Sequence, residues 1–284
     1  MSRALSKWVL MGVWASLLLV LPDRLRAQET RTLSFGIVPQ QSATKLASLW
    51  TPICEYLSQQ TGYRFVFKTA KDIPTFEKRL AAGEYDIAYM NPYHYTVFSI
   101  DPGYRAFARE TGKRIRGIVV VKKDSPYQSI GELAGKTLAF PAPAAFAASV
   151  LPRAYLKKNG IEITPKYVSS HDSVYLTVSK GLYPAGGGIQ RTFDNMPEAT
   201  RGKLRILWTT PEYTPHAFAA RPQLSAAVVN DVAGVLAGMG TDTEGRELLK
   251  NLNFNPLGPA RDRDWDDVRE LGIEVLKNLI KGKN

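Results

Sequence analysis

The sequence contains a single cysteine, Cys54, and so cannot form an internal disulfide. A chain without disulfides must take its stability from a packed core, and 284 residues are enough to build one. Cys54 lies in the run WTPICEYL (50–57), on the apolar face of a predicted helix. We therefore expect the thiol to pack in the core and not to serve as a reactive group or a metal ligand.

The sequence also lacks the short motifs that mark several enzyme classes. It has no Gly-x-Ser-x-Gly turn for a nucleophilic serine, no His-Glu-x-x-His zinc motif and no P-loop. We therefore expect no catalysis, no cofactor and no bound metal, and an exported enzyme is the less favoured alternative. The three histidines, His94, His171 and His216, are far apart in the sequence, so their spacing alone leaves a zinc site open.

Clusters of basic residues are absent, although the formal net charge is +11. The lysines and arginines are dispersed, without an arginine-rich run or an interleaved aromatic patch, which argues against nucleic-acid binding. A positive field favours an anionic ligand, and a solubilising surface explains the same charge equally well.

Long hydrophobic runs are absent after the first 21 residues. Arg3 and Lys7 precede an apolar run from Trp8 to Leu21, and the sequence Leu25-Arg26-Ala27 follows it. A basic start, an apolar stretch of this length and a small residue at the end predict a secretory signal peptide over residues 1–27. The run falls short of the roughly 20 apolar residues of a membrane span, and an uncleaved N-terminal anchor is the alternative.

Low-complexity segments and long repeats are absent, which disfavours a structural or adhesive protein, but one short pattern occurs twice. Residues 79–88 (RLAAGEYDIA) and 178–187 (VSKGLYPAGG) each end an amphipathic segment, turn on Gly83 or Gly181 and enter an apolar strand. Glycine suits these positions because helices commonly close with a residue in the left-handed region. Two such units predict two similarly built α/β lobes with a ligand between them.

The hydrophobic periodicity predicts alternating strands and helices along the chain. The order indicates an α/β fold with mixed, mostly parallel sheets covered by helices. The predicted strands are 32–38, 63–68, 85–90, 105–109, 116–122, 136–140, 166–168, 185–189 and 204–208, with a turn-rich stretch after the last through Pro211 and Pro215. The predicted helices are 43–60, 73–82, 144–159, 173–180, 225–237, 243–252 and 265–280.

Polar side chains follow two predicted strands of the first lobe. Gln40, Gln41 and Ser42 lie between the first strand and the first helix, where they can cap the helix or donate to an anion. Asn91, Tyr93 and Tyr95 follow the third strand. A tyrosine there can wall a small-ligand cleft with its ring, and packing in the core is the alternative.

Two further polar pairs follow strands of the second lobe. His171 and Asp172 open a helix, where histidine can donate to an oxyanion and the aspartate can cap the helix or orient the imidazole. Gln190 and Arg191 follow the glycine-rich strand, and Arg191 offers a planar fork for a tetrahedral or carboxylate anion. A structural histidine and a surface arginine are the alternatives.

Six short segments in register resemble the phosphonate, phosphite and phosphate periplasmic binding proteins of ABC transporters. Each segment is weak alone, but six in register are specific, and the resemblance covers essentially the whole chain after the signal. They are FGIVPQQ (35–41), GEYDIA (83–88), NPYHY (91–95), GKTLAF (135–140), LPR (151–153) and SHD (170–172).

This resemblance implies a two-lobed, hinged periplasmic binding fold of type 2. One lobe would comprise residues 28–118 and 210–284, and the other residues 119–209. The ligand would lie at strand ends and helix N-termini, with Tyr95 at a position where the family often carries a binding tyrosine. The resemblance also implies a monomer in the periplasm whose partner is an ABC permease or, alternatively, a sensor histidine kinase.

The sequence departs from this family at one site-forming segment. Phosphonate binders usually have a Ser-Thr-Ser-Gly-like run at the start of the second lobe's first helix, where this chain has Ala145-Phe146-Ala147-Ala148. Three hydroxyl donors are replaced, and the Phe146 ring occupies one of their places. Pro184 also stands where Asp86 stands in the first glycine turn. We therefore expect a smaller or less polar ligand, or a different oxyanion. Relatives that bind arsenite rely on a cysteine in the cleft. Because Cys54 is instead predicted to lie in a helix, an arsenite ligand is disfavoured.

Overall fold

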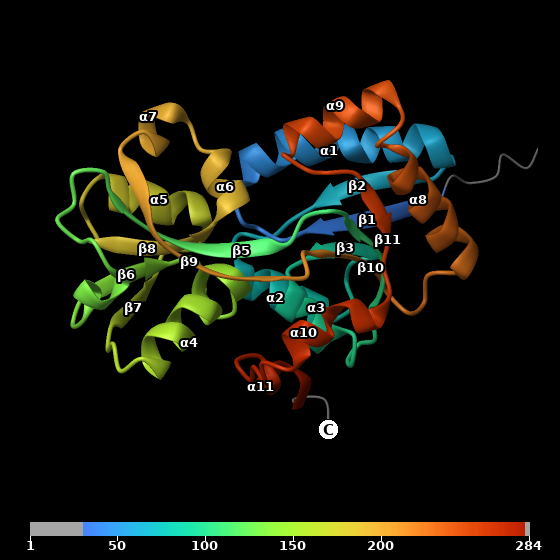
Figure 1. Cartoon of the computed structure of the whole chain (residues 1–284). Coiled ribbons are helices and arrows are strands. Elements are labelled where there is room, and N and C mark those ends of the chain that lie inside the picture. Colours follow the sequence, from blue (N-terminus) through green and yellow to red (C-terminus); the bar gives the residue numbers. More distant parts are fainter. Residues whose placement is uncertain (1–30, 282–284) are drawn as a thin grey trace, which may run out of the picture. The chain divides into compact units, whose positions relative to one another are not determined.

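The computed structural model describes residues 31–281, and the predicted signal peptide lies outside these residues. Figure 1 shows two sheets, each flanked by helices. Among the described residues, no helix is both long and apolar enough to cross a bilayer.

The first sheet has six strands in the order β11-β4-β10-β3-β1-β2. β1 pairs in parallel with β2 and β3, whereas β10 pairs antiparallel with β3 and β4. The parallel part follows from the predicted strand–helix–strand order, because parallel neighbours need a crossover helix. The strands are β1 (Thr32–Ile37), β2 (Arg64–Lys68), β3 (Ile87–Met90), β4 (Arg105–Glu110), β10 (Ala217–Ala220) and β11 (Leu257–Pro259).

The second sheet has five strands in the order β7-β6-β8-β5-β9. β6 pairs in parallel with β7 and β8, and β5 pairs antiparallel with β8 and β9. The sequence prediction of an α/β fold with mixed sheets is confirmed. The sheets are not mostly parallel, because among the described strands four pairs are parallel and five are antiparallel. The strands are β5 (Ile115–Lys122), β6 (Thr137–Phe140), β7 (Thr164–Tyr167), β8 (Ala185–Ile189) and β9 (Leu204–Tyr213).

The chain passes from the six-stranded to the five-stranded sheet between β4 and β5 and returns between β9 and β10. The predicted lobe boundaries, 118/119 and 209/210, fall inside β5 and β9. These two strands pair with each other, for example Ile118 with Thr209. The exact division of the chain into lobes at these positions stays a prediction.

Helices cover both faces of the six-stranded sheet (Figure 1). Phe35, Trp50, Tyr89 and Phe218 form an aromatic cluster in its core, with ring centroids 4.9–6.2 Å apart. One face carries α1 (Ala43–Thr61), α8 (Ala226–Gly238) and α9 (Thr243–Asn251). The other carries α2 (Ile73–Ala81), α3 (Pro92–Phe98), η3 (Asp262–Trp265), α10 (Asp266–Arg269) and α11 (Lys277–Lys281).

The five-stranded sheet is buried on both faces by helices, and β5 shows why its sequence is β-branched. Ile118 and Val120 pack on the side of α5, whereas Val119 and Val121 pack on the side of α4. Alternate residues of a strand point to opposite faces, so a doubly covered strand is apolar throughout. The helices are η1 (Ile130–Leu133), η2 (Phe146–Val150), α4 (Leu151–Lys158), α5 (His171–Ser179), α6 (Gln190–Asp194) and α7 (Glu198–Arg201).

The two copies of the repeated pattern form equivalent turns. Gly83 and Gly181 have φ values of +66° and +73° and follow α2 and α5. In each turn the residue after the glycine donates its N–H to a carbonyl five positions earlier, Glu84 to Arg79 and Leu182 to Thr177. This Schellman geometry leads into β3 in one sheet and β8 in the other, as the sequence predicts.

Some predicted elements differ in the structure. The helix predicted over 265–280 is interrupted between α10 and α11, where Gly272 has a φ of +59°. β9 runs through Pro211 to Tyr213, where a turn-rich stretch was expected. The helix predicted from residue 144 begins as the π-turn η2. α3 and β10 were not predicted, because a seven-residue helix and a four-residue strand give too short a periodic signal.

Candidate functional site

Two small adjoining cavities are lined by residues from both sheets and their helices. Their volumes are about 20 and 10 Å³, which is room for about one water molecule each. Val38 and Gln40 line both. The first is also lined by Gln41, Trp50, Tyr89, Arg191, Thr192, Asn195 and Phe254, among others. The second is also lined by Asn91, Ala145, Phe146, Ala147, Ala148, His171 and His216, among others.

Arg191 is the charged side chain of the first cavity. It lies in the first turn of α6, immediately after the glycine-rich strand β8. Its guanidinium lies 4.7 Å from the centroid of the Phe254 ring and 5.8 Å from that of Tyr89. Its Nη1 is 3.4 Å from Oε2 of Glu110, at the end of β4. The guanidinium thus reaches from α6 to the six-stranded sheet, held by a carboxylate and two aromatic rings.

Two buried imidazoles line the second cavity. Nε2 of His216 lies 2.9 Å from Nε2 of Gln40, and Nδ1 of His171 lies 3.0 Å from Oγ1 of Thr192. As placed, the Gln40 amide donates to His216, which puts the imidazole proton on Nδ1. That Nδ1 is buried and has no hydrogen-bond partner among the described residues.

Burial keeps both imidazoles neutral. Desolvation, helped by the nearby Arg191 charge, lowers the pKa of His171 to about 3. The same causes, together with His94 and His171, hold the pKa of His216 well below its usual value. Neither ring therefore adds positive charge to the site near neutral pH, and each can still donate one N–H.

The segment that departs from the family pattern lines the second cavity. Ala145 precedes η2, and Phe146 packs edge-on against Tyr213 at a centroid distance of 5.4 Å. Gly117 of β5 and Gly187 of β8 let this segment approach the sheet. A Cβ at these positions would overlap the carbonyl oxygens of Ala147 and Ala148. The glycines of β8 thus make room for backbone and helix packing.

The polar segments predicted in the two lobes contact each other directly. The His171 N–H donates to the Gln40 carbonyl at 2.9 Å, and the Ser42 N–H donates to Oδ2 of Asp172 at 3.1 Å. The Ser42 hydroxyl also caps α1 by accepting from the Lys45 N–H. Burial, the largest cause, raises the pKa of Asp172. Of these residues Gln40 and His171 line a cavity, whereas Ser42 and Asp172 do not.

Asn91 and Gln190 have partners that fix their side chains. Asn91 lines the second cavity and caps α3 through its Oδ1, which accepts from the His94 N–H. Its Nδ2 donates to the Ala144 carbonyl, which ties α3 to the segment before η2. Gln190 donates to Asp194 within α6 and lines neither cavity.

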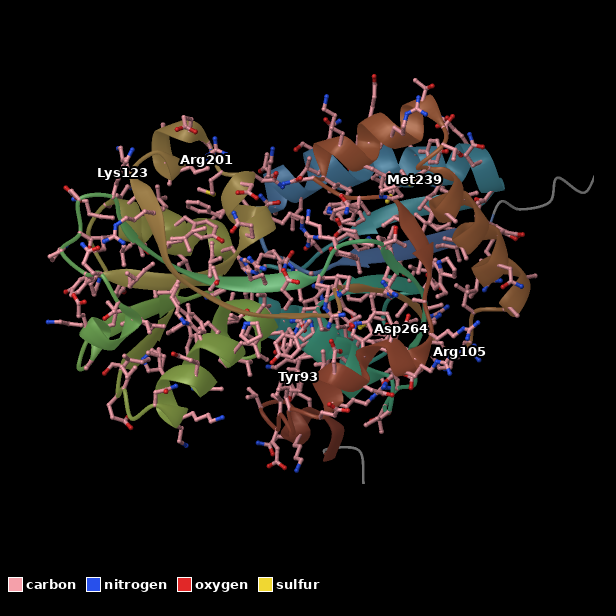
Figure 2. All side chains as sticks on the ribbon, viewed as in Figure 1. Tyr93, Arg105, Lys123, Arg201, Met239 and Asp264 are labelled. Carbon is pink, nitrogen blue, oxygen red and sulfur yellow. The ribbon has the colours of Figure 1, made fainter. Side chains whose placement is uncertain are left out.

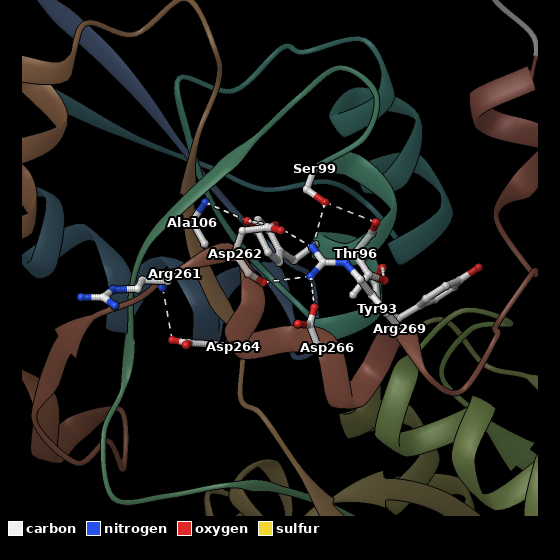
Figure 3. A network of polar contacts seen from close by, with 10 residues as sticks. Tyr93, Thr96, Ser99, Ala106, Arg261, Asp262, Asp264, Asp266 and Arg269 are labelled. Carbon is white, nitrogen blue, oxygen red and sulfur yellow. Dashed lines mark hydrogen bonds and ion pairs between the residues drawn. The ribbon is translucent and has the colours of Figure 1, made fainter.

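Tyr93 and Tyr95 point toward the C-terminal segment and line neither cavity. Tyr93 accepts the Leu276 N–H, and Figure 2 shows it beside this segment. The Tyr95 hydroxyl donates to Asp262 at 2.7 Å, and Asp262 pairs with Arg269 in the network of Figure 3. Their positions match a packing role for both tyrosines, the alternative that the sequence left open.

The remaining histidine and the cysteine lie elsewhere. His94 pairs with the buried Glu77 at 2.9 Å. Cys54 is buried in α1, where desolvation, with a smaller effect of Glu55, raises the pKa of its thiol to about 12. Between residues 31 and 281, no three His, Cys, Asp or Glu side chains come together as a metal site.

The sequence did not single out several residues of the first cavity. Trp50, Tyr89 and Phe254 form its aromatic wall, and Glu110 holds Arg191. The three aromatic residues lie on α1, β3 and the loop before β11, and their types fit core positions equally well. Glu110 ends β4, and its pairing with Arg191 depends on the tertiary structure. His216 was singled out only as a possible metal ligand. Its position between Pro215 and β10 carried no periodic signal.

Comparisons with known proteins agree with this architecture. A curated relative, the "Phosphate-import protein PhnD" of Mycolicibacterium smegmatis, is 21% identical over 88% of both chains. A binding component of an ABC phosphonate transporter from Pseudomonas aeruginosa superposes with a TM-score of 0.80 at 19% identity, over 88% of both chains. PhnD1 from Prochlorococcus marinus, solved in complex with methylphosphonate, has a TM-score of 0.78 at 17% identity, over 89% of this chain and 99% of its own. These solved structures establish the shared fold, that of two-lobed periplasmic binding proteins.

A model of one protein family matches residues 35–265, which include all eleven residues proposed from the sequence for the site. The matched region contains both sheets except the first residues of β1. The chain therefore belongs to the family of periplasmic substrate-binding proteins of phosphonate ABC transporters.

Proposed function

We propose that this protein binds a small oxyanion of the phosphonate, phosphite or phosphate type between its lobes and delivers it to an ABC permease. The observation that carries the proposal is Arg191. Among the described residues that line the two cavities, it alone carries a charge. A guanidinium can bind two oxygens of a tetrahedral anion at once, with charge-assisted hydrogen bonds.

Neutral donors around Arg191 support an oxyanion. The amides of Gln40, Gln41 and Asn195 line the first cavity, and the neutral imidazole of His171 lines the second. Backbone N–H groups at the start of η2 add donors, because the first N–H groups of a helix lack intrahelical partners. These backbone donors replace part of what the hydroxyl run supplies in other phosphonate binders. The methylphosphonate bound to the Prochlorococcus relative supports the same ligand class.

The small size of the cavities supports binding by lobe movement. A tetrahedral oxyanion is larger than one water molecule, so it requires side chains or lobes to move apart. The contacts from His171 N–H to the Gln40 carbonyl and from Arg191 to Glu110 cross between the sheets at the cavities. We propose that these contacts open and re-form around the ligand, and that the closed form is recognised by the permease.

The relatives favour an ABC permease as the partner, and hence a role in transport. The curated relative is named for phosphate import, and the superposed Pseudomonas structure is a binding component of an ABC phosphonate transporter. A periplasmic partner of a histidine kinase has no support among them. Membership of a family of substrate-binding proteins likewise disfavours an exported enzyme.

Titration calorimetry and thermal unfolding of the purified protein test this proposal. The panel contains phosphate, phosphite, methylphosphonate, sulfate, arsenate, arsenite and small carboxylates. A ligand at one hundred times its Kd should stabilise the protein by about 2.7 kcal/mol. We expect a phosphorus oxyanion to bind and Arg191→Ala to weaken it at least about tenfold, because a hydrogen bond to a charged group contributes about 1.5–3 kcal/mol.

Arg153→Ala is the matched control for this experiment. Arg153 lies on α4, packs over the Tyr167 ring at 5.9 Å and lines neither cavity, so its loss removes the same charge elsewhere. Equal effects of the two substitutions would contradict a role for Arg191 as the anion receptor. Binding of a carboxylate in preference to every phosphorus oxyanion would contradict the ligand class.

A further inference from the structure

The positive charge of Arg191 is compensated before any ligand arrives. Glu110 has a relative exposure of only 4%. Its Oε1 accepts the Asn255 N–H at 2.8 Å, and its Oε2 faces Nη1 of Arg191 at 3.4 Å. Burial and the Asn255 N–H hold this carboxylate in place. Once the contact between Arg191 and Glu110 has re-formed around a ligand, the bound anion therefore shares the guanidinium with a negative neighbour.

The other ionisable groups around the cavities do not restore a positive excess. Lys113 lies 3.6 Å from Glu110 on the more exposed side, and Lys45 and Asp172 are opposite charges near Gln41 and Ser42. Asp194 pairs with Gln190 on α6. With Arg191 and Glu110 included, these are three basic and three acidic side chains. The other titratable groups near the cavities are the buried phenol of Tyr89, the imidazoles of His171 and His216, and the His94–Glu77 pair.

We propose that the site binds its oxyanion as the monoanion, and that Glu110 sets this preference. The inference rests on the proposed function and adds the charge state of the ligand to it. One negative charge can be matched by Arg191, whereas a second would lie close to Glu110 without a cation of its own. Burying an uncompensated charge is costly. A monoanion instead keeps a proton on one oxygen, and the side-chain amide oxygens of Gln40, Gln41 and Asn195 are acceptors of the cavity wall.

Glu110 lines neither cavity, so it acts through Arg191. Its contribution should appear in the dependence of affinity on ligand charge. A purely structural role would change affinity for all anions alike.

The first test measures the affinity of the unmodified protein between pH 7 and 9. Methylphosphonate loses its second proton over this range, whereas methanesulfonate stays a monoanion and sulfate a dianion. We expect the association constant of methylphosphonate to fall about tenfold for each pH unit above the second pKa of the ligand, in proportion to its monoanion. Methanesulfonate should bind independently of pH, and sulfate more weakly than methanesulfonate.

The second test is Glu110→Gln, which keeps the shape and removes the charge. We expect it to bind methylphosphonate at least about tenfold more tightly at pH 9 and to flatten the pH profile, because a negative charge close to the dianion is removed. Glu212→Gln is the control, since Glu212 is half-exposed on β9, pairs with Arg116 and lines neither cavity. Its pH profile should match that of the unmodified protein.

Several results would overturn the inference. One is an affinity of the unmodified protein for methylphosphonate that stays constant or rises from pH 7 to 9, and this needs no variant. Another is a folded Glu110→Gln protein with an unchanged profile. In both cases an oxyanion still binds and the proposed function stands. Failure of every oxyanion to bind at any pH would overturn the proposed function, and the inference with it.

Discussion

Single glycines position the segment that lines the second cavity. Gly117 and Gly187 lie on adjacent strands, and each lacks the Cβ that would overlap a carbonyl oxygen of the Ala145–Ala148 segment.

Asp86 has a structural role in the first glycine turn. It accepts from the Ser34 N–H and hydroxyl and pairs with Arg221 at 2.7 Å, and it lines neither cavity. The proline at position 184 in the second copy therefore says little about the ligand.

Gly187→Ala should destabilise the protein and weaken oxyanion binding together. The added methyl group forces η2 away from β8, and overpacking of this kind costs about 1–3 kcal/mol. Chemical unfolding and titration calorimetry measure the two effects. In Gly234→Ala, at an open position inside α8, the methyl group meets nothing within 4 Å, and we expect a gain of about 0.5–1 kcal/mol. A Gly187→Ala protein as stable as the unmodified one would show that η2 can retreat without cost.

At the scale of the element, the two glycine turns are the feature that the sequence predicts best. A left-handed residue after an amphipathic helix is a local requirement, so its signal lies within a few neighbouring residues. The segment 265–280 shows the opposite case. Its composition suits a helix, but the chain turns at Gly272 and Tyr93 takes the Leu276 N–H. A contact with a residue 183 positions away is not visible in the local pattern.

Gly83→Ala and Gly181→Ala should each lower the free energy of unfolding by about 1–2 kcal/mol. The cost arises because an L-residue with a side chain adopts the left-handed conformation unfavourably. Near-equal losses, measured by denaturant unfolding, would reflect the equivalent geometry of the two turns. Gly131→Ala, at a position with negative φ and no close neighbour for a Cβ, should change stability far less. A loss confined to one of the two turns would contradict their equivalence.

At the scale of the whole molecule, the cavities exist because distant segments meet. Arg191 on α6 reaches Glu110 on β4, and His216 immediately before β10 reaches Gln40 after β1. The same packing of distant segments buries His171 and His216. In the unfolded chain both imidazoles return to their ordinary pKa, so folding and protonation are coupled.

Acid should destabilise the protein in a window set by these imidazoles. Because burial lowers the pKa of His171 from 6.5 to about 3, the neutral form belongs to the folded state. Its stabilising contribution is complete above pH 6.5 and is lost as the pH falls toward 3. In this window the His171 imidazole makes the free energy of unfolding fall by about 1.4 kcal/mol per pH unit, and His216, whose pKa is also lowered by burial, acts in the same direction.

Denaturant unfolding between pH 8 and 5 measures this loss. His171→Gln should reduce the dependence of the unfolding free energy on pH below 6.5 by the effect of about one proton, which is about 1.4 kcal/mol per pH unit. The amide can still pair with Thr192 but does not titrate. An equal slope in the variant and the unmodified protein would mean that His171 is protonated in the folded state.

The sequence by itself determined the α/β class, the two glycine turns, the core position of Cys54 and, through six short segments, the family. These features depend on periodicity and on local backbone requirements, which neighbouring residues encode. The tertiary structure decided which polar residues meet. It brings Gln40, Gln41, Asn91, Phe146, His171 and Arg191 to the cavities and directs Tyr93 and Tyr95 to the C-terminal segment. It also adds Glu110 and His216, because strand order and side-chain direction are set by packing between segments far apart in the chain.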